Sequence, residues 1–133
     1  MAIGRLKNGE ERIVGIIGDE DTVTGFLLAG IGDNRPVEAQ ATGDRKAVAQ
    51  PNYAVITPST PLADIEDAFT NMTANPSIGV IIICQHIANE IRHLMEGFTD
   101  HIPCILEIPS KGGVYDASKD QVLVKINRAL GCQ

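Results

Sequence analysis

The sequence contains no tryptophan, and aromatic residues make up only 4% of its 133 residues. It is also poor in positive charge, with 11 lysines and arginines against 17 acidic residues and a formal net charge of -6 at pH 7. A chain with so few basic residues lacks the positive patch with which proteins hold phosphate backbones. Nucleic acid is therefore not an expected partner.

Long hydrophobic segments are missing as well. No run approaches the roughly 18 consecutive apolar residues that a membrane-spanning helix needs. The amino-terminal stretch MAIGRLKNGEERIVGIIG has no apolar signal-peptide core followed by a cleavage site of small residues. We therefore expect the chain to work in the cytoplasm, without direct insertion into a membrane.

Residues that bind metals are few and poorly spaced. Cys84, Cys104 and Cys132 lack the CxxC spacing of zinc and redox sites, and two of them stand inside apolar runs, as reduced core cysteines do. His86 and His93 are about 10 Å apart along a helix, which is too far for them to share one metal ion. We expect no metal site, and we expect both histidines at the surface or in an interface.

Apolar residues, in contrast, make up 44% of the chain, which is enough for one compact core. Four apolar runs predict strands at 12–17, 53–56, 78–84 and 103–108. Helical periodicity predicts helices at 22–31, 61–74 and 85–98, and a final helix of about 15 residues after Asp116. Thr60 is the expected cap of the second helix, with Pro61 in its first position.

The alternation of these elements predicts an α/β fold. We expect a small four-stranded parallel sheet flanked by helices, Rossmann-like in its layers, with a carboxyl-terminal helix. The run IGVIIIC at 78–84 is typical of a central strand covered on both faces. We divide the chain into a Rossmann-like domain at 1–112 and a helical tail at 113–133, with a long surface loop around 32–52.

The stretch IIGDEDTVTGFLLAGIG, at 16–32, is the first place to look for a ligand site. Ligands of open parallel sheets bind beyond the carboxyl ends of the strands, where GDED lies. However, no GxGxxG spacing follows the strand, and Ile31 and Gly32 stand where a P-loop needs lysine and serine or threonine. Neighbouring carboxylates would also repel phosphate, so we expect no nucleotide and no other cofactor.

The same acids resemble those of phosphoacceptor receiver domains, but the third strand ends in Cys84 and Gln85, without the acceptor aspartate. No serine lies in a GxSxG motif either, so we expect no catalytic residue. We interpret Asp19, Glu20 and Asp21 as residues that neutralise the positive end of the first helix and satisfy its free N–H groups. A stand-alone phosphoacceptor or small-ligand-binding module is the alternative function.

Three long segments carry a family resemblance: IIGDEDTVTGFLLAGIG at 16–32, IGVIIICQHIANEIR at 78–92 and IPCILEIPSK at 102–111. They are followed by Tyr115-Asp116 and Lys119-Asp120, which lead into the last helix. In these segments the chain resembles the F subunits of eukaryotic V-type (vacuolar) proton ATPases. The resemblance covers most of the sequence outside the first residues and the 33–52 loop.

This resemblance implies a non-catalytic subunit of the central stalk, or rotor, of a proton-pumping ATPase. The implied partners are the D subunit of the V-ATPase, the catalytic ring of A and B subunits and other stalk subunits. The implied role is to couple ATP hydrolysis to proton translocation and to regulate it. The implied location is the cytosolic face of vacuolar or other acidic endomembranes, within the soluble head of the complex.

The expected site is accordingly a protein interface. It joins Leu28, which lies off the apolar face of the first helix, to residues near the carboxyl terminus: Ile108, Ser110, Lys111, Tyr115, Lys119, Val122, Leu123, Lys125 and Ile126. Leu28 is covered either by the rim of the sheet or by another protein. The last helix either leaves the domain to lie on a partner or packs on its own sheet, as amphipathic helices do by default.

Overall fold

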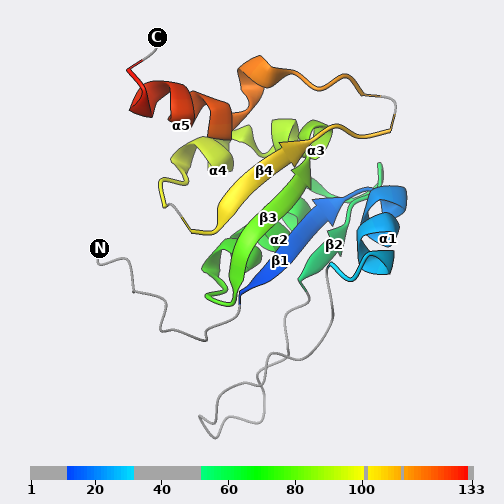
Figure 1. Cartoon of the computed structure of the whole chain (residues 1–133). Coiled ribbons are helices and arrows are strands. Elements are labelled where there is room, and N and C mark those ends of the chain that lie inside the picture. Colours follow the sequence, from blue (N-terminus) through cyan, green and yellow to red (C-terminus); the bar gives the residue numbers. More distant parts are fainter. Residues whose placement is uncertain (1–11, 32–51, 101, 112, 132–133) are drawn as a thin grey trace, which may run out of the picture.

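The computed structural model describes residues 12–31, 52–100, 102–111 and 113–131 (Figure 1). The elements follow one another as β1 (Ile13–Gly18), α1 (Glu20–Leu28), β2 (Tyr53–Val55), α2 (Leu62–Ala74), β3 (Ile78–Cys84), α3 (Gln85–Glu90), α4 (Arg92–Gly97), β4 (Cys104–Ile108), the 3-10 turn η1 (Ala117–Lys119) and α5 (Gln121–Ala129). None of the described helices has the length and apolar character needed to cross a membrane.

The four strands form one parallel sheet in the order β2-β1-β3-β4. β3 lies inside the sheet, where its apolar run pairs with β1 on one side and β4 on the other. In register, Ile82 lies opposite Ile16 of β1 and Leu106 of β4. The predicted α/β fold is confirmed: a four-stranded parallel sheet, flanking helices and a helix at the carboxyl end.

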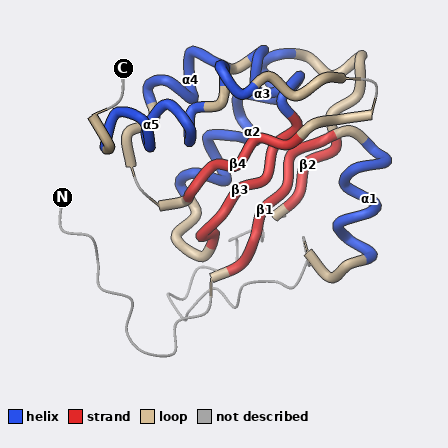
Figure 2. Tube along the Cα trace, turned by 45° about the horizontal axis from the view of Figure 1, so that its top comes forward, coloured by secondary structure: helices blue, strands red, loops and turns tan. Residues whose placement is uncertain are grey.

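One face of the sheet carries the main core. Alternation along the strands turns Ile81 and Ile83 to this face, and both side chains are completely buried. Helices α2, α3 and α4 cover it (Figure 2). The residues of α2 that are buried in this core are Ile65, Phe69 and Met72.

The opposite face is covered less completely. Among the described helices only α1 lies on it, against β1 and β2, with Val23 as its buried residue (Figure 1). Val80 and Ile82 of β3 are only half-buried on this face, and Leu106 of β4 is exposed. Within the described residues, the expected cover of β3 on this second face is therefore only partial.

Several predicted helix ends also differ from the structure. The predicted helix at 85–98 is two helices, because Ile91 leaves helical geometry with φ -113° and ψ 26°. Thr60 does not cap α2, since its hydroxyl accepts a hydrogen bond from the Thr57 N–H instead. Pro61 precedes the helix, and its carbonyl accepts the bond from Ile65 that opens the first turn.

The last helix is shorter than the predicted 15 or so residues. Asp116 caps the separate turn η1 by accepting from the Ser118 N–H, and Asp120 then caps α5 by accepting from the Val122 N–H. α5 consequently has 9 residues. Most of the expected 32–52 loop lies outside the described residues.

Candidate interaction surface

The acidic corner after β1 is held by contacts within the chain. Asp19 Oδ1 accepts hydrogen bonds from the Thr22 hydroxyl at 2.5 Å and from the Cys84 thiol at 3.5 Å. Glu20 and Asp21 stand in the first turn of α1, where negative charge is favourable. The Asp19 side chain makes no bond to a backbone N–H of α1. The structure therefore agrees with the expected placement of negative charge at the amino-terminal end of α1. It does not show the expected hydrogen bond from a backbone N–H of α1 to Asp19, whose side chain accepts from Thr22 and Cys84 instead.

The hydrogen bond from Thr22 lowers the pKa of Asp19. A carboxylate with a lowered folded-state pKa stabilises the fold above its unfolded pKa of about 4, and this contribution is lost as the pH falls through the folded value. Thr22→Val should therefore raise the pKa of Asp19 towards its ordinary range and shift the loss of this contribution to higher pH. An NMR titration of the Asp19 carboxyl carbon measures the shift. Thr24→Val is the control, and an unchanged midpoint in Thr22→Val would contradict the assignment.

The residue at the end of β3 cannot act as the nucleophile that a phosphoacceptor domain needs. Cys84 is completely buried, and this burial raises the pKa of its thiol. The thiol therefore stays protonated near neutral pH and donates its hydrogen to Asp19.

The chain itself occupies the carboxyl edge of the sheet. After β4 it crosses this edge towards α1 and then returns to η1 (Figure 1). Lys111 Nζ lies 2.8 Å from Asp21 Oδ2 on α1. The Gln85 side chain donates to the Asp116 carbonyl at 2.7 Å and accepts from the Asp116 N–H at 2.6 Å. The edge at which open α/β sheets bind ligands is thus crossed by a tethered segment of the same chain.

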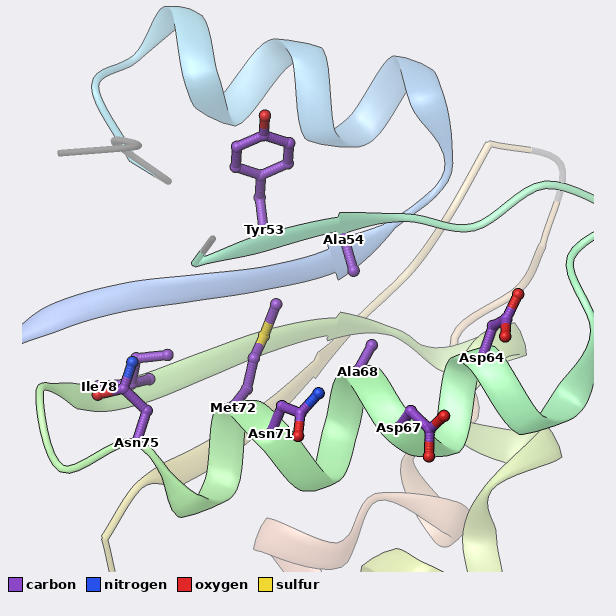
Figure 3. A pocket seen from close by; sticks show the side chains of 9 residues that line it. All are labelled: Tyr53, Ala54, Asp64, Asp67, Ala68, Asn71, Met72, Asn75 and Ile78. Atoms are coloured by element: carbon purple, nitrogen blue, oxygen red, sulfur yellow. The ribbon is translucent and has the colours of Figure 1, made fainter. Parts of the chain in front are cut away.

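A hollow of about 310 Å³ lies between the edge strand β2 and helix α2 (Figure 3). Ala54 and Met72 point into the space between these two elements, whereas the Tyr53 ring points towards α1. Asp64 and Asp67 stand apart along α2 and do not converge on one point. The residues that line this hollow include no nucleophile paired with a base, so we assign no reaction to it.

A buried polar cluster, formed by Gln85, Arg92 and Glu107, ties the terminal segment to the sheet. The Glu107 side chain on β4 is 0% exposed, and its two oxygens accept from Arg92 at 2.9 and 3.0 Å. One of these oxygens also accepts from the Gln121 N–H, at the first residue of α5, at 3.0 Å. These donors offset the cost of burying the carboxylate, so Glu107 anchors the start of α5.

This cluster was not among the residues expected from the sequence. A single acid inside the apolar strand CILEI was the available signal, since an isolated carboxylate on a buried strand needs a partner. The positions of Gln85 and Arg92, which precede Glu107 by 22 and 15 residues, are fixed only by the fold.

The turn before α5 has a second set of contacts. The Tyr115 hydroxyl donates to Asp120 Oδ2, and this bond raises the pKa of Tyr115 to about 12. Asp120 Oδ1 accepts from the Val122 N–H at 3.0 Å and caps α5. The amino-terminal end of α5 is therefore fixed by both Glu107 and Asp120.

The remainder of α5 is loosely packed. It contains no buried residue, and a hollow of about 140 Å³ lies between Val122 and Ile126 on α5 and Ile105 on β4. Leu123 is 36% exposed, Ile126 46% and Leu130 72%. These three residues recur at helical spacing and form what we call the apolar strip.

Hydrogen exchange should reveal this difference in packing. Backbone amides of α5 beyond its first turn should exchange far faster than those of β3, because few apolar contacts protect them. Exchange followed by mass spectrometry or NMR on the isolated chain measures both. Equal protection of α5 and β3 would contradict the loose packing described here.

The predicted interface residues fall into separate groups in the structure. Leu28 is 86% exposed at the end of α1, so the rim of the sheet does not cover it. Lys111 lies beside the amino-terminal end of α1, through Asp21. The remaining residues extend from the end of β4 to α5: Ile108, Ser110, Tyr115, Lys119, Val122, Leu123, Lys125 and Ile126.

Comparison with known proteins shows which family the sequence matches. The family described as "ATP synthase (F/14-kDa) subunit" matches residues 14–126. The chain is 42% identical over 120 residues to the probable V-type proton ATPase F subunit of Caenorhabditis elegans, covering 90% of this chain and 88% of that protein. It is 43% identical over 122 residues to the V-type proton ATPase F subunit of Dictyostelium discoideum, covering 92% of each. It is 42% identical over 118 residues to the Homo sapiens F subunit, covering 86% of this chain and 87% of that protein.

Proposed function

The chain belongs to the family of V-type proton ATPase F subunits, and from this premise we propose that it binds the D subunit in the central stalk and couples ATP hydrolysis to proton translocation. F subunits are non-catalytic parts of the proton-transporting complex. The proposal adds the direct partner, the role in coupling and regulation, and a surface of this chain for the contact.

The observation that carries the proposal is the apolar strip on α5. An amphipathic helix normally buries its apolar side, yet Leu123, Ile126 and Leu130 remain exposed while the start of the helix is anchored. Burial of the exposed part of each side chain on a partner would contribute about 0.5 to 2 kcal/mol before the ordering costs of binding. The strip is therefore the surface that we assign to the D subunit.

The rest of the chain suits a mechanical role. The sheet with its packed core is a stiff body that transmits force through contacts, whereas bond breaking is left to the ring of A and B subunits. Leu28 on α1 and Lys111 beyond β4 are further positions for contacts with the ring or with other stalk subunits. We place the chain on the cytosolic face of an acidic endomembrane, within the head of the complex.

Affinity isolation of the tagged chain from cells tests this proposal. The D subunit and the A and B subunits should be recovered with it under gentle conditions, and recovery of neither would contradict the proposal. Glu20→Lys reverses an exposed charge in the acidic corner and should leave recovery unchanged, because Glu20 serves only the amino-terminal end of α1.

The small-ligand alternative has its own test. Calorimetry of the purified chain with nucleotides, with magnesium and with acyl phosphates should give no heat of binding. Saturable binding of any of these would favour a ligand-binding module over a stalk subunit.

A further inference from the structure

A groove of about 950 Å³ runs between α4 and the segment formed by η1 and α5. Phe98 and Val124 supply apolar lining, and Glu96 is the single acid in the groove. The groove is also lined by four basic side chains: Arg92, Lys119, Lys125 and Arg128. We call this feature the basic groove.

The charge of the groove is opposite to that of the chain. It gathers four of the 11 lysines and arginines but only one of the 17 acidic residues. Arg92 is already paired with Glu107. Within the described residues, no carboxylate lies within ion-pair distance of Lys119, Lys125 or Arg128, so three positive charges remain available to an anion.

Contacts within the groove hold one of these charges in place. Lys125 Nζ donates to the Phe98 carbonyl at 3.3 Å and lies 5.7 Å from the centre of the Phe98 ring. These contacts hold the ammonium group of this exposed side chain beside the apolar lining.

The groove and the apolar strip lie on opposite sides of α5. With 3.6 residues per turn, Val124, Lys125 and Arg128 fall on the side that faces α4. Leu123, Ile126 and Leu130 fall roughly half a turn away. One partner can therefore bind the strip while another occupies the groove.

We propose that the basic groove receives an acidic segment of a second V-ATPase subunit, distinct from the contact of the apolar strip with the D subunit. The inference rests on the proposed function, because it requires the chain to be inside the complex. Carboxylates of the segment pair with Lys119, Lys125 and Arg128, while its apolar side chains lie on Phe98 and Val124. A polypeptide segment suits the groove because its carboxylates and its apolar side chains can contact both walls at once.

Zero-length cross-linking of the isolated complex tests the inference. A water-soluble carbodiimide joins lysine amines to adjacent carboxylates, and mass spectrometry then identifies the linked peptides. We expect Lys119 or Lys125 to be linked to an aspartate or glutamate of a neighbouring polypeptide of the complex. Lys111 should be linked to Asp21 of the same chain, which shows that the reagent has reacted.

A charge-reversal variant adds a second readout. Lys119→Glu combined with Arg128→Glu should weaken retention of the cross-linked neighbour at least tenfold in a salt titration, while the D subunit is retained. An intact complex with the Lys111 link but no link from Lys119 or Lys125 to another polypeptide would overturn the inference and leave the proposed function standing. Binding of the chain to phosphatidylserine vesicles in place of such links would also overturn it. Recovery of none of the other subunits would overturn both proposals.

Discussion

Leu123→Asp combined with Ile126→Asp is expected to abolish binding to the D subunit. The two side chains are exposed in the isolated chain and belong to the strip that we assign to this partner. Because Leu123 is 36% and Ile126 46% exposed, loss of their further burial removes roughly 1 to 2.5 kcal/mol, which corresponds to a reduction in affinity of about 5- to 70-fold. Two carboxylates placed in an apolar contact would weaken it further. Calorimetry or surface plasmon resonance with the purified D subunit measures the loss.

The fold of the double variant should be preserved, because α5 contains no buried residue. Leu62→Asp is a suitable control, since Leu62 is 47% exposed, close to the 46% of Ile126, and lies on α2. It should bind the D subunit with the affinity of the parent chain. Unchanged binding of the double variant would show that the D subunit contacts another surface.

Glu107→Ala is expected to release the terminal segment and to destabilise the chain by about 3 kcal/mol. The substitution removes the carboxylate that pairs with Arg92, which keeps only Asn89 Oδ1 as an acceptor, and leaves the Gln121 N–H without its acceptor. The magnitude is at the lower end for a broken buried pair, because the Arg92 side chain is 19% exposed and water can partly solvate it. Urea unfolding measures the stability, and hydrogen exchange at the first turn of α5 measures the release.

Two further variants test whether the destabilisation comes from loss of the buried Arg92–Glu107 pair or from the loss of any negative charge. Glu107→Gln keeps an acceptor for Gln121 but loses the charge, so its destabilisation should be smaller than that of Glu107→Ala. Glu90→Ala removes an exposed acid at the end of α3 and should change stability little. If Glu107→Ala unfolded at the same urea concentration as the parent chain, Glu107 would not anchor α5.

The sheet could be predicted from sequence because its central strand leaves little choice. The run at 78–84 is apolar throughout apart from Gly79, and β3 has the predicted bounds, Ile78–Cys84. The apolar side of α1 was predicted less well. Phe26 and Leu27 follow Val23 at helical spacing, but among the residues of α1 only Val23 is buried, and the main contacts of this helix are with β1 and β2. Periodicity shows that a helix has an apolar side, not how much of the sheet that side meets.

The interface could be predicted only in part, because local patterns do not specify contacts between distant parts of the chain. The resemblance drew attention to the terminal residues, and Leu123 and Ile126 were among the expected interface residues. The anchor at Glu107 depends on contacts with Arg92 and Gln121, which no local pattern specifies. The basic groove likewise exists only once α5 lies beside α4, since its lysines and arginines are dispersed in the sequence.

The most direct measurement is the molar mass of the mixture when the purified chain is combined with the purified D subunit, followed by size-exclusion chromatography with light scattering. A single species with one copy of each polypeptide is predicted, and it should be lost when Leu123 and Ile126 are replaced by aspartate. Elution of the two proteins as separate species at micromolar concentration would contradict a direct role in the central stalk.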